Sequence, residues 1–164
     1  MRQAALALLL ALVARPVPGT ANTIDPLEVS WDKIVQEAAR EAKFIYLAFL
    51  GDGWSVASTR FSSNVLESQA FQEFASRKLL YCPVLARTSP PMSKERTAHL
   101  QALVIHFDMQ AYPTFLILAP DGTELLRHGY KNLQGKEYVR LLESIIPEVT
   151  GEKPPPTTHI LKQY

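Results

Sequence analysis

The sequence predicts a three-layer α/β sandwich with a central, mostly parallel four-stranded sheet, a terminal antiparallel hairpin and helices on both faces. Short apolar runs alternate with segments whose apolar residues recur every three or four positions. The order of these segments is helix, strand, helix, strand, helix, hairpin, helix. The chain has 164 residues, of which 47% are hydrophobic, which is enough to bury the core of one compact domain.

The N-terminus has the pattern of a secretory signal peptide. Arg2 precedes an unbroken apolar run from Ala4 to Ala14, and the small residues Gly19 to Ala21 follow it. This run is much shorter than the roughly 20 residues that span a bilayer. We therefore expect an exported protein, periplasmic or secreted, with no membrane span after cleavage. The expected divisions are a signal peptide at 1–21, one folded domain at 22–149 and a flexible proline-rich tail at 150–164.

The first folded segments predict a helix, a strand and a second helix. Ser30 is suited to cap a helix over 31–43, where apolar residues share one face. The run 44–50 is apolar throughout and ends at glycines, which indicates a strand buried on both faces. A helix is expected to begin near Trp54.

The middle of the chain predicts a helix, a strand and a loop. Ser68 can cap a helix that ends near Lys78, and the run 79–86 is the next strand. Pro83 lies inside this strand and has no N–H to donate, so the strand must be an edge or bulge there. The segment 87–95 is a polar, proline-containing loop.

The last third predicts a helix, a hairpin and a closing helix. Apolar spacing marks the helix around 100–107. A strand at 114–119, a tight turn at 120–123 and a partner strand at 124–128 form the hairpin. Apolar residues at helical spacing over 138–146 mark the closing helix.

Charge and cysteine content exclude several classes of function. The formal net charge is +1, which gives no electrostatic reason to bind nucleic acid. Cys82 is the single cysteine, so neither an internal disulfide nor a four-cysteine zinc site can form. His99 and His106 are about 10 Å apart on one predicted helix, too far to share an ion, so we expect them to be surface or packing residues. We expect no metal and no cofactor.

Three motifs give the chain a resemblance to the thioredoxin superfamily, most closely to small exported thioredoxin-like proteins, over residues 31 to about 146. The motifs are FIYLAFLGDGWSVAS from Phe44, FQEF from Phe71, and AYPTFLILAPDGTELLRHGY from Ala111. The resemblance implies the thioredoxin fold. It also implies a cis peptide bond before Pro113.

The chain departs from this family at the position of its chemistry. In active members the tryptophan is followed by C-x-x-C, whereas Ser55 and Ser58 stand at those two places here. A serine hydroxyl does not ionise near neutral pH and forms no S–S bond, so two-cysteine exchange is unavailable. Phe49 also replaces a buried carboxylate of thioredoxins. We therefore favour a protein that is not an enzyme. The degenerate active-site positions are Trp54, Ser55, Val56, Ala57 and Ser58. We expect Ser55 to cap the helix that begins there, because its oxygen can accept from the N–H groups of the first turn.

The peptide groove is the part of the family's site that needs no sulfur. In the resembled proteins, backbone beside the cis-proline pairs with an extended segment of the partner. Ala111, Tyr112 and Pro113 would form this edge, with the rings of Trp54 and Tyr112 on either side of a shallow groove. The predicted function is non-redox binding of an extended peptide or a partner protein.

Other interpretations remain open from the sequence. Cys82 could retain a one-thiol activity, although its strand position favours a buried structural thiol. GWSVA partly matches the nucleophile elbow G-x-S-x-G, so Ser55 could serve a hydrolase with His128 and with Asp108 or Asp121. In a third interpretation, serines were introduced into a formerly active oxidoreductase.

Overall fold

The computed structural model describes residues 21–146 and confirms the predicted α/β sandwich. The sheet has five strands in the order β1-β3-β2-β4-β5, one more than predicted. β1, β3 and β2 are parallel, and β4 and β5 form the antiparallel hairpin. The strands are β1 Asn22–Thr23, β2 Phe44–Asp52, β3 Leu79–Arg87, β4 Thr114–Leu118 and β5 Glu124–Gly129.

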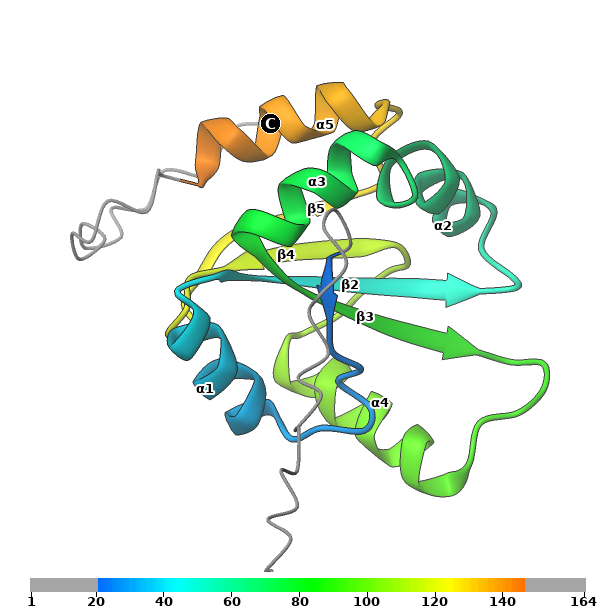
Figure 1. Ribbon diagram of the computed structural model, residues 1–164. Helices are drawn as coiled ribbons and strands as arrows, with labels where there is room; N and C mark the ends of the chain where they lie inside the picture. Colours follow the sequence, from blue (N-terminus) through cyan, green and yellow to red (C-terminus); the bar gives the residue numbers. More distant parts are fainter. Residues whose placement is uncertain (1–20, 147–164) are drawn as a thin grey trace, which may run out of the picture.

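Helices cover both faces of the sheet (Figure 1). α1 and α4 pack on one face, and α2, α3 and α5 pack on the other. A short π-helix, η1, continues α2 and was not predicted. The helices are α1 Trp31–Glu41, α2 Val56–Phe61, η1 Ser62–Leu66, α3 Gln69–Lys78, α4 Lys94–His106 and α5 Gly135–Ile145.

β2 is the central strand and contributes to both cores. Tyr46 and Ala48 face the core under α2, α3 and α5, whereas Leu47 and Phe49 face the core under α1 and α4. Because successive side chains of a strand point to opposite faces, a strand with helices on both sides must be apolar throughout. The continuous apolar run of the sequence is therefore explained.

β3 lies beside the short β1, and Pro83 falls where β1 has already ended. β1 pairs with Leu80 and Tyr81, and the Ile24 N–H donates to the Tyr81 carbonyl at 2.9 Å. Residues two apart on a strand point their backbone groups to the same side, so the nitrogen of Pro83 faces this outer edge. At Pro83, β3 has no partner strand on its outer side within residues 21–146, so this part of the strand is an edge, as predicted. The missing N–H of the proline therefore removes no hydrogen bond from the sheet.

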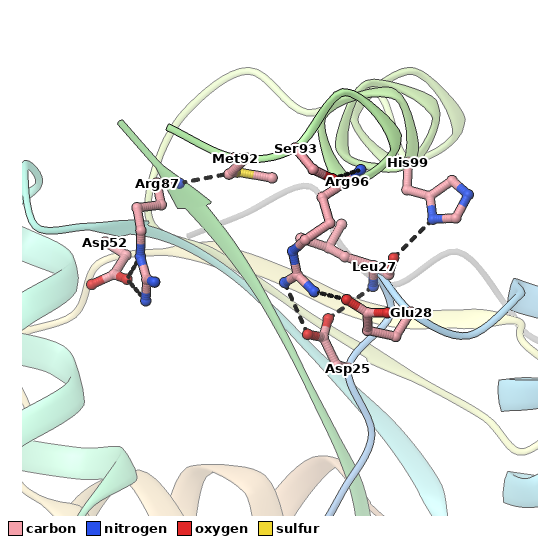
Figure 2. Close-up of polar contacts among 9 residues, drawn as sticks. All are labelled: Asp25, Leu27, Glu28, Asp52, Arg87, Met92, Ser93, Arg96 and His99. Atoms are coloured by element: carbon pink, nitrogen blue, oxygen red, sulfur yellow. Dashed lines mark hydrogen bonds and ion pairs between the residues drawn. The ribbon is translucent and has the colours of Figure 1, made fainter. Parts of the chain in front are cut away.

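The segment before α1 is tied to α4 by charged side chains (Figure 2). The Arg96 guanidinium binds Asp25 at 2.9 Å and also pairs with Glu28. His99 Nδ1 lies 2.8 Å from the Leu27 carbonyl oxygen and donates to it. These contacts place the loop that leads from β1 to α1 against α4.

The expected signal peptide, apart from Ala21, and the proline-rich tail lie outside the described residues. Within 21–146, no helix is long and apolar enough to cross a membrane.

Candidate functional site

Ser55 caps the helix that begins directly after the central strand. Its backbone is extended, and its Oγ accepts a hydrogen bond from the Ser58 N–H at 3.2 Å. The side chain is only 8% exposed. A cap of this kind stabilises a helix by about 1 kcal/mol. The capping role expected from the sequence is confirmed, and the hydroxyl points into the first turn rather than toward solvent.

Ser58 ties the same helix back to the end of β2. Its Oγ accepts from the Gly51 N–H at 3.0 Å. Gly51 itself has no room for a side chain, because a Cβ there would lie 2.7 Å from the Trp54 ring and from the Ser55 Cβ. The turn between β2 and α2 is therefore held by the hydroxyls of Ser55 and Ser58 and by the packing of the Trp54 ring against Gly51.

Trp54 is held in one orientation at the surface. Its indole N–H donates to the Ala86 carbonyl at 2.8 Å, and its ring meets Tyr112 edge to face with centroids 5.5 Å apart. The side chain is nevertheless 48% exposed. Sequence reasoning missed Ala86, because a backbone acceptor on another strand leaves no mark in the residue pattern.

The peptide bond between Tyr112 and Pro113 is cis, as the resemblance implied. Pro113 is buried, Tyr112 is half-buried and Ala111 is exposed. The Thr114 hydroxyl donates to the Ala111 carbonyl at 2.8 Å, so that carbonyl is already engaged. Within residues 21–146, no hydrogen bond occupies the backbone N–H or carbonyl of Tyr112.

The two aromatic rings do not flank a groove, which corrects the expectation from the sequence. Their edge-to-face contact leaves no gap through which a chain could pass. Val56, two positions after Trp54 in the sequence, is also exposed, at 68%. We call the side chains of Trp54, Val56 and Tyr112 the aromatic surface. Ala57, next along the helix, is half-buried.

An ion pair closes the end of the sheet beside Trp54. The Arg87 Nε donates to Asp52 at 2.7 Å across the ends of β2 and β3, and the Arg87 N–H donates to the Met92 sulfur at 3.5 Å (Figure 2). Asp52 and Arg87 are paired with each other. The polar border of the aromatic surface is therefore charge-compensated on this side.

Cys82 is a core residue. It lies on β3 with no exposed surface, in the apolar core under α1 and α4. Burial raises the pKa of its thiol to about 12. Because the thiolate is the nucleophile, a buried thiol that is this hard to ionise is poorly suited to attack a disulfide near neutral pH. The buried position of Cys82 agrees with the structural interpretation and does not favour the one-thiol alternative.

We expect Cys82 to resist thiol reagents while the protein is folded. At pH 8 a group with a pKa of about 12 is ionised in only about one molecule in ten thousand. Reaction with a chromogenic disulfide reagent should be complete within minutes in 6 M guanidinium chloride and should proceed only through opening in native buffer. Stoichiometric labelling of the native protein at mixing would contradict this.

The hydrolase alternative is contradicted. Both ring nitrogens of His128 are engaged away from Ser55, one with Tyr138 Oη and one with the Gly129 carbonyl, each at 2.7 Å. Asp108 bonds Gln110 and Asp121 bonds the Thr123 backbone. A serine nucleophile needs a base within hydrogen-bond reach, and His128 is not a partner of Ser55.

The histidines expected to be surface or packing residues are so placed. His106 packs against the rings of Trp31 and Phe107, and His99 is bound to the Leu27 carbonyl. Phe49 is fully buried and contacts the Phe107 ring, so position 49 holds no acid. Among residues 21–146, no group of three or more metal-binding side chains occurs.

Comparison with known proteins finds one curated protein that is similar over most of the chain. No protein-family profile matches the chain. The chain is 22% identical to the disulfide bond reductase DsbH of Chlamydia pneumoniae over 117 residues, which cover 71% of this chain and 70% of the relative.

Solved structures of similar fold include thioredoxins and a related oxidoreductase. The DsbH oxidoreductase superposes with a TM-score of 0.68 at 23% identity, covering 80% of this chain and 89% of the other. A thioredoxin from Thermus thermophilus gives 0.55 at 12% identity, with 77% and 87% covered. The poplar thioredoxin h, PtTrxh4, gives 0.54 at 20% identity, with 80% and 100% covered.

Proposed function

We propose that this chain, which has the thioredoxin fold and lacks a dithiol, binds an extended segment of a partner protein at its aromatic surface without redox chemistry. The single observation that carries the proposal is the pairing of two features in one place. The aromatic surface is rigidly held but exposed, and the backbone of Tyr112 beside it has no partner within residues 21–146.

The backbone of Tyr112 supports recognition by strand addition. An extended segment can pair with one N–H and one carbonyl while its side chains alternate between the surface and solvent. The cis bond that follows and the buried Pro113 fix where these two groups point. Ala111 offers less than we expected from the sequence, because Thr114 already donates to its carbonyl.

The absence of the dithiol separates this proposal from the reductase name of the relative. Two sulfurs are needed to attack a disulfide and then to resolve the mixed disulfide. This chain has one cysteine, and that cysteine is buried. Binding uses hydrogen bonds and apolar contact instead, and it needs neither metal nor cofactor.

We further propose that the protein acts outside the cytoplasm, in the periplasm or secreted. The signal-peptide pattern of residues 1–21 supports export. The proposed division into a signal peptide at 1–21, a thioredoxin-like domain at 22–149 and a tail at 150–164 is consistent with the described fold, which begins with β1 at Asn22.

Replacing Trp54 should weaken binding of an extended peptide roughly thirtyfold, because a buried aromatic anchor is commonly worth about 2 kcal/mol or more. The probe is a fluorescein-labelled dodecapeptide with apolar residues at alternate positions, followed by anisotropy. Trp54→Ala should lose affinity. Ile105→Ala should not, although Ile105 is 79% exposed, because it lies on α4 and is not part of the aromatic surface.

A second probe tests the strand addition itself. The same peptide with N-methyl groups on alternate amides should bind much more weakly, since it can no longer donate to the Tyr112 carbonyl. The Tyr112 amide signal should shift on binding of the unmethylated peptide only. Equal binding by Trp54→Ala and by the parent chain, at matched thermal stability, would reject the proposed site.

A further inference from the structure

A chain of hydrogen bonds crosses the protein interior from the central strand to the edge of the sheet. Tyr46 on β2 bonds Tyr138 on α5 at 2.8 Å between hydroxyl oxygens. Tyr138 bonds His128 Nε2 on β5 at 2.7 Å, and His128 Nδ1 lies 2.7 Å from the Gly129 carbonyl oxygen. Both tyrosines are fully buried, and His128 is half-buried.

The Gly129 carbonyl at the end of this row of hydrogen bonds determines which group donates in each of them. A carbonyl oxygen can only accept, so His128 Nδ1 carries a proton. In the neutral ring Nε2 is then an acceptor, and Tyr138 donates to it. Tyr138 has only one proton, so the bond to Tyr46 is donated by Tyr46. With His128 neutral, the side chains of Tyr46, Tyr138 and His128 all have hydrogen-bond partners.

Protonation of His128 is incompatible with this arrangement of hydrogen bonds. Both ring nitrogens of the charged ring are donors, so Tyr138 must accept from Nε2. One of the two tyrosine protons is then left without an acceptor in a buried position, which is unfavourable.

The surroundings of His128 do not offset the charge. Phe115 on β4 and Tyr138 on α5 pack against the ring, and Lys131 adds positive charge nearby. Within residues 21–146, no carboxylate forms an ion pair with His128. Burial, with a smaller effect from Lys131, lowers the pKa of His128 below its ordinary value.

We propose that Tyr46, Tyr138 and His128 form a proton-operated latch that holds α5 against the sheet at neutral pH and releases it in acid. Tyr138, Leu142 and Ile146 are the core contacts of this last helical segment. Its first residue, Gly135, lies against Ser68. Release therefore reaches the turn between η1 and α3.

The sign of the pH dependence follows from the lowered pKa. Above the pKa of an unfolded histidine, about 6.5, both the closed and the open states are neutral and the latch is at full strength. As the pH falls below that value, the open state binds a proton that the closed state refuses. The opening equilibrium should then rise about tenfold per pH unit until the pKa of the closed state is reached.

Amide hydrogen exchange between pH 7.5 and 5 tests the latch in the full chain and requires no partner. Protection factors in α5 should fall with pH in the parent protein, while those around Ile34 and Ala38 in α1 should change little. In His128→Gln the amide oxygen can still accept from Tyr138 but does not titrate, so the pH dependence of α5 should vanish. His106→Gln, which alters an exposed histidine on α4, should behave like the parent.

A measurement on the unsubstituted protein covers the case in which His128→Gln does not fold. Nitrogen-15 spectra should show Nδ1 protonated and Nε2 without a proton at pH 7.5, with a titration midpoint of His128 below about 6.5, the ordinary value of a histidine. Retention of the pH dependence in His128→Gln, equal loss of protection in α1 and α5, or protonation of Nε2 at pH 7.5 would each overturn the latch.

Discussion

The double variant Ser55→Cys, Ser58→Cys will reduce disulfides, whereas the parent chain will not. The two positions flank the first turn of α2, where Ser55 Oγ accepts from the Ser58 N–H at 3.2 Å, and this is the i, i+3 spacing of C-x-x-C. A thiolate at position 55 would receive the same N–H group and the positive end of the helix. Lowering a thiol pKa from about 8.5 to about 7 raises the thiolate fraction at neutral pH from a few per cent to about half.

The electron balance defines the assay and its control. Thiolate 55 attacks the substrate disulfide, thiol 58 resolves the mixed disulfide, and dithiothreitol restores the pair. Insulin precipitation in dithiothreitol measures the rate above the reagent alone. Ser55→Cys alone supplies the attacking thiol without the resolving thiol, so it should accumulate mixed disulfide and turn over slowly.

The buried Phe49 limits the gain. Position 49 holds no proton acceptor, so the double variant should be slower than a thioredoxin assayed in parallel. A well-folded double variant that shows no rate above dithiothreitol would mean that the turn no longer has the geometry of an exchange site. The same rate in the parent chain would contradict the claim that the missing dithiol abolishes exchange.

Phe61→Ala should cost about 3–5 kcal/mol of the free energy of unfolding, the range for large aromatic truncations in a core. Phe61 is 1% exposed and lies where three elements meet. Its ring centroid is 4.1 Å from that of Phe115 on β4 and 5.0 Å from that of Tyr138 on α5. Truncation removes the side chain that anchors α2, and with it the Ser55 cap, to the sheet.

Urea unfolding followed by circular dichroism measures this loss. Arg60→Ala is the matched control, because it alters the adjacent, exposed residue of the same helix and should change stability by less than about 0.5 kcal/mol. Phe61→Leu should fall between the two, since it keeps most of the buried volume. A cost of Phe61→Ala no larger than that of Arg60→Ala would show that α2 is not held by this contact.

The sheet could be predicted from the sequence largely because its strands are buried. Unbroken apolar runs marked β2, β3 and β4, and the PDG turn after β4 marked the hairpin. β1 was missed because Asn22 and Thr23 are polar and form only two residue pairs. The π-helix at 62–66 was missed because a one-residue change in helical hydrogen bonding does not alter the apolar pattern enough to be seen.

The candidate site was named from the sequence, but the arrangement of its side chains was not predicted correctly. Ser55 as a cap and the cis bond before Pro113 followed from local chemistry and from the resemblance. The contact between Trp54 and Tyr112 joins residues that are 58 positions apart in the sequence. Its geometry depends on the Ala86 carbonyl, which any residue type would supply. Side-chain identity alone therefore could not distinguish a groove from a surface.

The proline on β3 limits how this molecule can aggregate. Fibril growth requires an incoming strand to find an unbroken row of donors along an exposed sheet edge. On the outer side of β3, the Tyr81 carbonyl already accepts from the Ile24 N–H, and Pro83 has no N–H. The Arg87 N–H donates to the Met92 sulfur. Edge-to-edge stacking of misassembled copies would thus be interrupted at this border, so any such stacking should begin at β5.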